Sequence, residues 1–213
     1  MNPRDTLHGL YAITDAAWTP VQTLLSQVEA ALKGGVRIVQ LREKSQSDTA
    51  LLPLARSLVA LCHRYGALCL IDDRIALTVE SGADGIHIGK EDTPLPEARR
   101  LLPSAIIGVS CYDTLDLGIA AQNGGADYVA FGAFFPTAIK PDAPHPPPTL
   151  IREARQRLDI PVCVIGGISL ETLPGLIPYG PDMAAVISGL WNAPCIETRT
   201  RELAHCFNPG VVQ

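Results

Sequence analysis

Short apolar runs alternate along the chain with longer segments in which apolar residues recur at helical spacing. This alternation is typical of repeated βα units. Eight strands are predicted, at Leu10–Thr14, Arg37–Leu41, Leu68–Ile71, Gly85–Ile88, Ile106–Ser110, Tyr128–Phe131, Val162–Ile165 and Ala184–Ser188. Eight helices are predicted after them, at Pro20–Lys33, Ser47–Tyr65, Ile75–Ser81, Leu95–Leu102, Leu115–Asn123, Thr149–Gln156, Leu170–Ile177 and Ile196–Cys206.

Glycines follow several of the predicted helices, where a left-handed C-cap favours this residue. The phrases Gly82-Ala83-Asp84-Gly85 and Gly124-Gly125-Ala126-Asp127-Tyr128 repeat the same order of helix end and strand start. Eight units in 213 residues leave about 27 residues for each, enough for a strand, a helix and two connections. We therefore predict one α/β domain over residues 1–213, a single (β/α)8 TIM barrel, because closure removes the edges of an open sheet. A doubly wound sheet is the alternative.

The composition sets limits on the class of protein. Hydrophobic residues make up 47% of the chain and charged residues 18%, which excludes a disordered chain. With 17 basic and 22 acidic side chains, the net charge of −5 argues against a broad surface for nucleic acid or an anionic membrane. The chain has no long apolar span, no signal-like start and six cysteines without a Cys-x-x-Cys pair, so we expect a soluble, cytoplasmic protein with reduced thiols.

A candidate anion site follows the second predicted strand, in the phrase Gln40-Leu41-Arg42-Glu43-Lys44. If the extended conformation continues, Gln40, Arg42 and Lys44 share one face. An amide, a bidentate guanidinium and a mobile ammonium suit a multiply charged phosphate. The alternative interpretation is a solvated charged turn.

Two acidic clusters follow the third and fourth predicted strands. Asp72 and Asp73 follow the first of these strands, and Glu91 and Asp92 follow the second. Neighbouring parallel strands lie about 4.8 Å apart, so carboxylates from the two clusters can share a hard cation such as Mg²⁺. Capping of the following helices is the alternative role for each aspartate.

Three further polar residues follow or lie within strands. Ser110 has no obvious His or Asp partner in the sequence that would activate it, so a hydrogen-bonding role is predicted. His87 lies inside a predicted strand, as a hydrogen-bonded interior residue or, alternatively, as a catalytic base. Lys140 follows the sixth strand, from which it can meet the same anion as Arg42.

The loops after strands 6, 7 and 8 supply the other candidate ligands. Gly166-Gly167-Ile168 and Ile187-Ser188-Gly189 end the seventh and eighth strands, where many barrels of this kind bind phosphate. The proline-rich segment at about 132–148 is predicted to be a mobile active-site lid, with an ordinary surface loop as the alternative.

Together, the order of these motifs resembles the thiamine phosphate synthase family from Gly9 to Ser188. The most specific pieces are the phrase from Gln40 to Lys44, Asp84-Gly85-Ile86-His87-Ile88-Gly89, Phe135-Pro136-Thr137 with Lys140, and Ile165-Gly166-Gly167-Ile168. The resemblance implies an enzyme that condenses 4-amino-2-methyl-5-hydroxymethylpyrimidine pyrophosphate with thiazole-ethyl phosphate, giving thiamine phosphate and pyrophosphate. It implies a dissociative reaction, Mg²⁺ as cofactor, and phosphorylated small molecules as substrates, with no nucleic acid or membrane partner and with partner proteins left open.

The resemblance also implies a role for each matching residue. The residues implied to bind the pyrimidine pyrophosphate are Gln40, Arg42, Lys44, Asp72, Ser110 and Lys140, of which Arg42, Ser110 and Lys140 are the expected catalytic residues. The residues implied to bind the thiazole phosphate are Thr137, Ile139, Gly167, Ile187 and Ser188. Asp73 and Asp92 are the implied magnesium ligands.

Four positions depart from the family pattern, namely Asp72, Lys90, Tyr112 and Ile139. Asp72 stands where Asn is usual and Lys90 where Gln is frequent, and we expect these two side chains to pair across neighbouring strands. Two alternative functions remain, a thiazole tautomerase-like isomerase and a non-catalytic binder of thiamine intermediates. The isomerase would need neither the cationic fork nor the paired aspartates, and the four departures are the only support for the binder.

Overall fold

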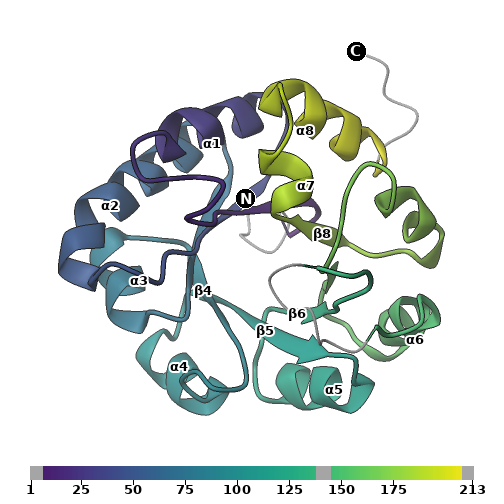
Figure 1. Cartoon of the computed structure of the whole chain (residues 1–213). Coiled ribbons are helices and arrows are strands. Elements are labelled where there is room, and N and C mark those ends of the chain that lie inside the picture. The colour runs from purple at the N-terminus through teal and green to yellow at the C-terminus, as the bar shows by residue number, and fades with distance from the viewer. Residues whose placement is uncertain (1–6, 138–144, 208–213) are drawn as a thin grey trace.

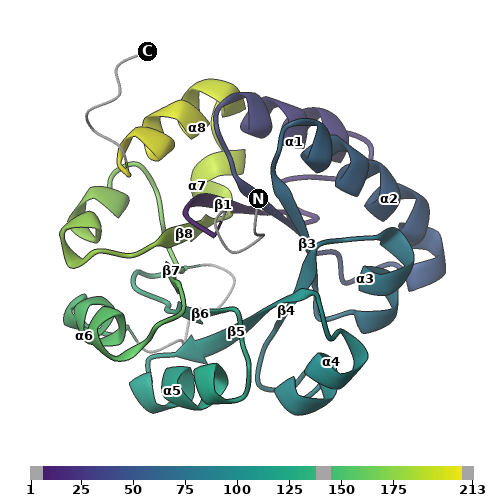
Figure 2. The same ribbon diagram turned by 180° about the vertical axis from the view of Figure 1, so that it is seen from behind.

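The computed structural model describes residues 7–137 and 145–207, which form a closed barrel of eight parallel strands in sequence order, surrounded by helices (Figures 1 and 2). The strands are β1 (Gly9–Ile13), β2 (Ile38–Leu41), β3 (Leu68–Asp72), β4 (Gly85–Ile88), β5 (Ile106–Tyr112), β6 (Tyr128–Phe131), β7 (Val162–Val164) and β8 (Met183–Val186). The α-helices are α1 (Leu24–Lys33), α2 (Asp48–Arg64), α3 (Ile75–Ser81), α4 (Leu95–Leu101), α5 (Leu115–Asn123), α6 (Thr149–Arg157), α7 (Ser188–Trp191) and α8 (Ile196–His205). The predicted (β/α)8 barrel is confirmed.

Alternation along the strands divides the buried residues into two cores. One set of side chains, including Tyr11, Ile38, Leu70 and Tyr128, points into the barrel. The residues between them, such as Val39, face the helices and pack in the larger outer core. The inward positions continue into polar residues at the carboxyl ends of the strands, and this continuation places the candidate site.

Two predicted elements differ from the structure. The helix expected at Leu170–Ile177 is replaced by two 3₁₀ turns, η2 (Leu173–Gly175) and η3 (Ile177–Tyr179). Each contains a proline at its second position, and a proline has no N–H for a continuous α-helix. The strand expected to reach Ser188 ends at Val186, and Ser188 begins the short helix α7.

Three aspartates link neighbouring strands at the amino-terminal end of the barrel. Asp84, Asp127 and Asp182 each directly precede an even-numbered strand and accept a hydrogen bond from a main-chain N–H of the strand before it, at Cys69 (2.7 Å), Ile107 (2.9 Å) and Val162 (2.7 Å). Each also pairs with a basic side chain of an even-numbered helix, respectively His63, Arg99 and Arg155. We call Asp84, Asp127 and Asp182 the strand-linking aspartates. They give a structural reason for the repeated Gly-Ala-Asp phrases.

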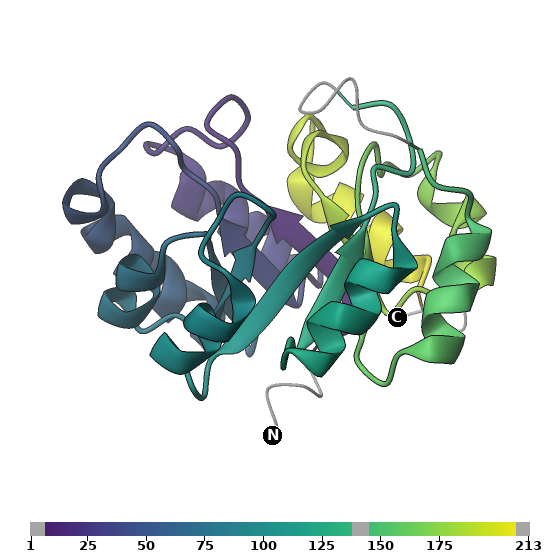
Figure 3. The ribbon, with the colours of Figure 1, turned by 90° about the horizontal axis from the view of Figure 1, so that it is seen from below.

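The connections that follow the strands gather at the opposite end of the barrel (Figure 3). This carboxyl-terminal end is where (β/α)8 enzymes place their chemistry. Among the described residues, no helix combines the length and apolar character needed to cross a membrane.

Candidate active site

A cavity of about 190 Å³ opens at the carboxyl ends of the strands. Predicted site residues that line it are Gln40, Arg42, Asp72, Ser110, Thr137, Gly167, Ile187 and Ser188. Lys140 and Ile139 lie outside the described residues, as does the central part of the predicted lid. The cavity therefore brings together residues from both of the expected phosphate sites.

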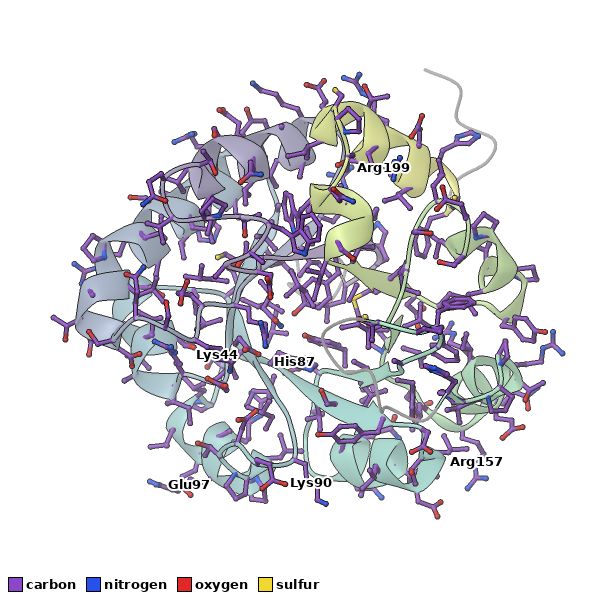
Figure 4. The ribbon with its side chains drawn as sticks, viewed as in Figure 1. Lys44, His87, Lys90, Glu97, Arg157 and Arg199 are labelled. Carbon is purple, nitrogen blue, oxygen red and sulfur yellow. The ribbon has the colours of Figure 1, made fainter. Side chains whose placement is uncertain are left out.

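A charged cluster lies at the carboxyl ends of β2 and β3, where Arg42 and Asp72 line the cavity. Arg42 Nη1 lies 3.0 Å from Asp15 Oδ2, and Arg42 Nε lies 3.7 Å from Asp72 Oδ2. Lys44 Nζ lies 2.8 Å from Asp72 Oδ2 and also binds Asp73. Figure 4 shows Lys44 beside the ring of strands, on the same side as His87. Two cations thus face three carboxylates where the fork was predicted.

Asp15 was not predicted as a site residue. Its main-chain N–H donates to Thr19 Oγ1 (2.9 Å), and its Oδ1 accepts from the N–H of Ala17 (3.0 Å). These bonds fix the carboxylate that holds Arg42. The only sequence signal was its position two residues after the end of β1, at the same end of the barrel as the other candidates.

The predicted pairing of Asp72 with Lys90 is wrong. Asp72 is held by Lys44 and Arg42, whose side chains extend from the end of β2 across β3. Lys90 donates its main-chain N–H to the Tyr112 hydroxyl (3.2 Å), and Figure 4 shows Lys90 farther out, near α4. The counter-charges for Asp72 therefore come from residues that follow β2, and not from a residue that follows β4.

The environment changes the pKa values within this cluster. Burial raises the pKa of Asp72, and the adjacent Lys44 ammonium offsets that effect only in part. For Lys44, partial burial lowers the pKa, but hydrogen bonds to Asp72 and Asp73 outweigh it and the pKa lies above its usual value. Lys44 is therefore a cation at neutral pH.

We expect Asp72→Asn to increase the free energy of unfolding at pH 7. The raised pKa of Asp72 means that the folded state binds its proton more tightly than the unfolded state does. The stability it contributes is present below the unfolded pKa and is lost as pH rises through the folded pKa. Denaturant titrations from pH 4 to pH 8 should show a flatter profile for the variant, and an unchanged profile would contradict this account.

The predicted magnesium ligands follow two paired strands, β3 and β4. Asp73 adopts a left-handed conformation (φ 50°) and donates its N–H to the carbonyl of His87 (3.0 Å). Asp92 Oδ2 accepts from the N–H of Gly89 (2.7 Å). No group of three or more metal-ligating side chains occurs within residues 7–137 and 145–207. Two carboxylates nevertheless suit Mg²⁺, which commonly binds one or two carboxylates together with substrate phosphate oxygens.

Ser110 has a histidine partner, contrary to the sequence analysis. His87 Nε2 lies 2.9 Å from Ser110 Oγ, because His87 pairs in register with Gly108, two residues before Ser110. His87 Nδ1 lies 2.8 Å from the Tyr128 hydroxyl. His87 is thus a hydrogen-bonded interior residue, as the first interpretation predicted. A phenol takes the place of the carboxylate that orients the histidine in a Ser-His-Asp triad.

The predicted phosphate loops lie across the cavity from the charged cluster. Phe134 and Phe135 donate their main-chain N–H groups to the carbonyls of Ile165 and Gly166, both at 3.1 Å, so the loop after β6 packs on the loop after β7. Gly167 is required at this contact, since its φ is +64° and a Cβ there would lie 2.6 Å from the Cβ of Phe135. Thr137, Gly167, Ile187 and Ser188 therefore line one side of the cavity.

Comparison with known proteins agrees with this geometry. Residues 10–190 match the family described as thiamine monophosphate synthase. The chain belongs to this family. It is 46% identical over 204 residues to the thiamine-phosphate synthase of Thioalkalivibrio sulfidiphilus, covering 95% of this chain and 97% of that protein. It is 44% identical over 209 residues to the thiamine-phosphate synthase of Alcanivorax borkumensis, covering 96% of each.

A solved structure agrees as well. The thiamine phosphate pyrophosphorylase of Pyrococcus furiosus superposes with a TM-score of 0.89 at 32% identity, covering 98% of both chains. These matches confirm the resemblance to the thiamine phosphate synthase family. The ligand role of each residue remains a prediction.

Proposed function

We propose that this protein condenses an aminopyrimidine-methyl diphosphate with a thiazole-ethyl phosphate, forming thiamine phosphate and releasing diphosphate. The names of the related enzymes support the product. The observation that carries the proposal is the pair Arg42 and Lys44 beside Asp72 and Asp73, of which Arg42 and Asp72 line the cavity. Such a charged cluster suits a diphosphate accompanied by a divalent cation.

In this proposal, Arg42 and Lys44 exchange their carboxylate partners for the diphosphate oxygens. Asp15 and Asp72 hold both cations near the required position beforehand, so little side-chain ordering remains when the substrate binds. Asp73 and Asp92 are the residues that would hold Mg²⁺, and the ion would supply charge neutralisation for the leaving diphosphate. Lys140 is proposed to contact the diphosphate too.

The thiazole phosphate is proposed to bind at the opposite side of the cavity, against Thr137, Gly167, Ile187 and Ser188, with Ile139 nearby in the sequence. The two ligands then meet above the floor formed by Gln40, His87 and Ser110. The departing diphosphate leaves a pyrimidine-methyl cation, and the thiazole nitrogen attacks its methylene carbon. The protein contributes positioning and stabilisation of charge, and no covalent enzyme intermediate is needed.

A coupled assay tests the proposal. Purified protein is given both substrates with Mg²⁺, and thiamine phosphate and diphosphate are measured in parallel. We expect equal amounts of both products, no product when either substrate is omitted, and loss of turnover when Mg²⁺ is chelated. Isomerisation of the thiazole phosphate alone would indicate the tautomerase-like alternative, and binding of both ligands without turnover would indicate a non-catalytic binder.

A further inference from the structure

A chain of four hydrogen bonds crosses the floor of the cavity and joins five strands. Gln40 Nε2 donates to the Tyr11 hydroxyl (2.6 Å), which lies 3.0 Å from the Tyr128 hydroxyl. Tyr128 contacts His87 Nδ1 (2.8 Å), and His87 Nε2 contacts Ser110 Oγ (2.9 Å). Gln40, Tyr11, His87 and Ser110 line the cavity, so the chain begins and ends at the site.

The two phenols in the middle of the chain are buried and held in place. Tyr11 is 1% exposed and Tyr128 is 0% exposed, and their rings meet edge to face at 78°. Gly108 leaves room for the Tyr128 ring, because a Cβ at Gly108 would lie 2.0 Å from Tyr128 Cζ. Burial also raises the pKa of both phenols well above the usual value, so each keeps its single hydrogen.

One hydrogen on each phenol gives the chain a direction. The Gln40 amide donates to Tyr11, so the Tyr11 hydrogen is free to point to Tyr128. With the Tyr11 hydrogen in that direction, the Tyr128 hydrogen is left for His87 Nδ1, and a bond in this direction requires Nδ1 to be the unprotonated nitrogen of the imidazole. In that tautomer His87 carries its hydrogen on Nε2 and can donate it to Ser110 Oγ.

We propose that Tyr11 and Tyr128 are positioning residues that fix His87 as its Nε2–H tautomer and so make Ser110 a hydrogen-bond donor toward the cavity. In this arrangement His87 has no free lone pair for the Ser110 hydrogen and does not act as its base. Ser110 meets its ligand as a donor to an acceptor such as a diphosphate oxygen, and it is not a nucleophile. The identity of that acceptor rests on the proposed function, whereas the tautomer does not.

Nitrogen-15 NMR of the ligand-free protein, labelled in its histidine rings, tests the tautomer directly. The expected spectrum shows an unprotonated, pyridine-type Nδ1 and a protonated, pyrrole-type Nε2 for His87, assigned by loss of the signals in His87→Gln. In Tyr128→Phe the Nδ1 atom loses its donor, and we expect both signals to shift toward a mixture of tautomers. Tyr11→Phe keeps the bond between Tyr128 and His87 and should produce a smaller shift. A protonated Nδ1 in the unaltered protein would overturn the proposal.

Turnover tests whether the two phenols act through Ser110. Tyr128→Phe is expected to lower kcat by about tenfold with little change in KM, which corresponds to roughly 1.4 kcal/mol for one misdirected hydrogen bond. Ser110→Ala should lower kcat by at least the same factor. The double variant that combines Tyr128→Phe with Ser110→Ala should be at most about twofold slower than Ser110→Ala alone, because residues of one hydrogen-bond network do not act additively. Tyr65→Phe removes the hydroxyl that donates to Glu29 on the outer surface, and it should leave both kcat and the His87 signals unchanged.

These measurements separate the tautomer from the catalytic assignment. Strictly multiplicative losses in the double variant would show that Tyr128 does not act through Ser110 and would overturn the positioning role. If neither substrate is turned over by the unaltered protein, the proposed function fails, and the NMR experiment still decides the tautomer of His87. A covalent adduct on Ser110, detected by mass spectrometry during turnover, would overturn its assignment as a donor.

Discussion

Replacing Asp73 or Asp92 by alanine is expected to lower kcat on the order of 10³-fold. The proposed ion stabilises the leaving diphosphate by several kcal/mol, and each 1.36 kcal/mol corresponds to a factor of ten in rate. The two carboxylates follow neighbouring strands, so the loss of either one leaves a single protein ligand. Initial rates of diphosphate release at several Mg²⁺ concentrations measure the effect.

Glu91→Ala is the matched control for Asp92→Ala. Glu91 is an exposed carboxylate adjacent to Asp92, so its removal changes the net charge equally without removing a proposed ligand. Calorimetric titration of inorganic diphosphate with and without Mg²⁺ gives a readout besides turnover. Magnesium should strengthen diphosphate binding in the unaltered protein and in Glu91→Ala but not in either aspartate variant. Equal magnesium dependence in all four proteins would remove Asp73 and Asp92 from the metal site.

The substitution Asp127→Ala is expected to lower the free energy of unfolding by about 3 kcal/mol. It leaves the buried N–H of Ile107 without its acceptor and Arg99 without its counter-charge, and each loss costs on the order of 1–3 kcal/mol. For a domain of this length, about 3 kcal/mol corresponds to a decrease in Tm of roughly 6–12 °C. Thermal and denaturant unfolding measure the change.

Two further variants show whether burial explains this loss. The Asp182 side chain is 23% exposed, compared with 6% for Asp127, so Asp182→Ala should cost less although it breaks the same kinds of bond. Asp159→Ala removes an exposed carboxylate and should change the stability by less than about 0.5 kcal/mol. If Asp127→Ala lowers the free energy of unfolding by no more than Asp159→Ala does, the strand-linking aspartates do not stabilise the barrel.

The barrel was predictable from sequence because each unit carries its own signals. The predicted bounds of β4, β6, α3 and α5 agree with the structure. Apolar strands bounded by glycine and polar residues determine these elements locally. The seventh helix was predicted wrongly because apolar spacing outweighed Pro174 and Pro178, which limit that segment to 3₁₀ turns.

The site was predictable only where its residues lie on one segment or on neighbouring strands. Gln40 and Arg42 follow from alternation along β2, and both line the cavity. The contact between Tyr11 and Tyr128 joins β1 to β6 across the interior, and no local pattern specifies such a pair. Asp72 pairs with Lys44 and not with Lys90 because of the directions that these two long side chains take at the strand ends. Spacing along the chain does not determine those directions.

The strand-linking aspartates have a consequence for how this protein can change over evolutionary time. They occur before β4, β6 and β8, and Asp182 also accepts a main-chain bond from Gly9 (2.7 Å) where the last strand meets the first. Closure of the ring is thus supported by a recurring two-strand module at the amino-terminal end of the barrel, while the candidate ligand-binding groups among the described residues lie at the carboxyl-terminal end. Substitutions that alter substrate preference at the carboxyl-terminal end of the barrel leave the bonds of the strand-linking aspartates intact. The same framework can therefore tolerate departures such as Asp72 and Tyr112 without losing its closed form.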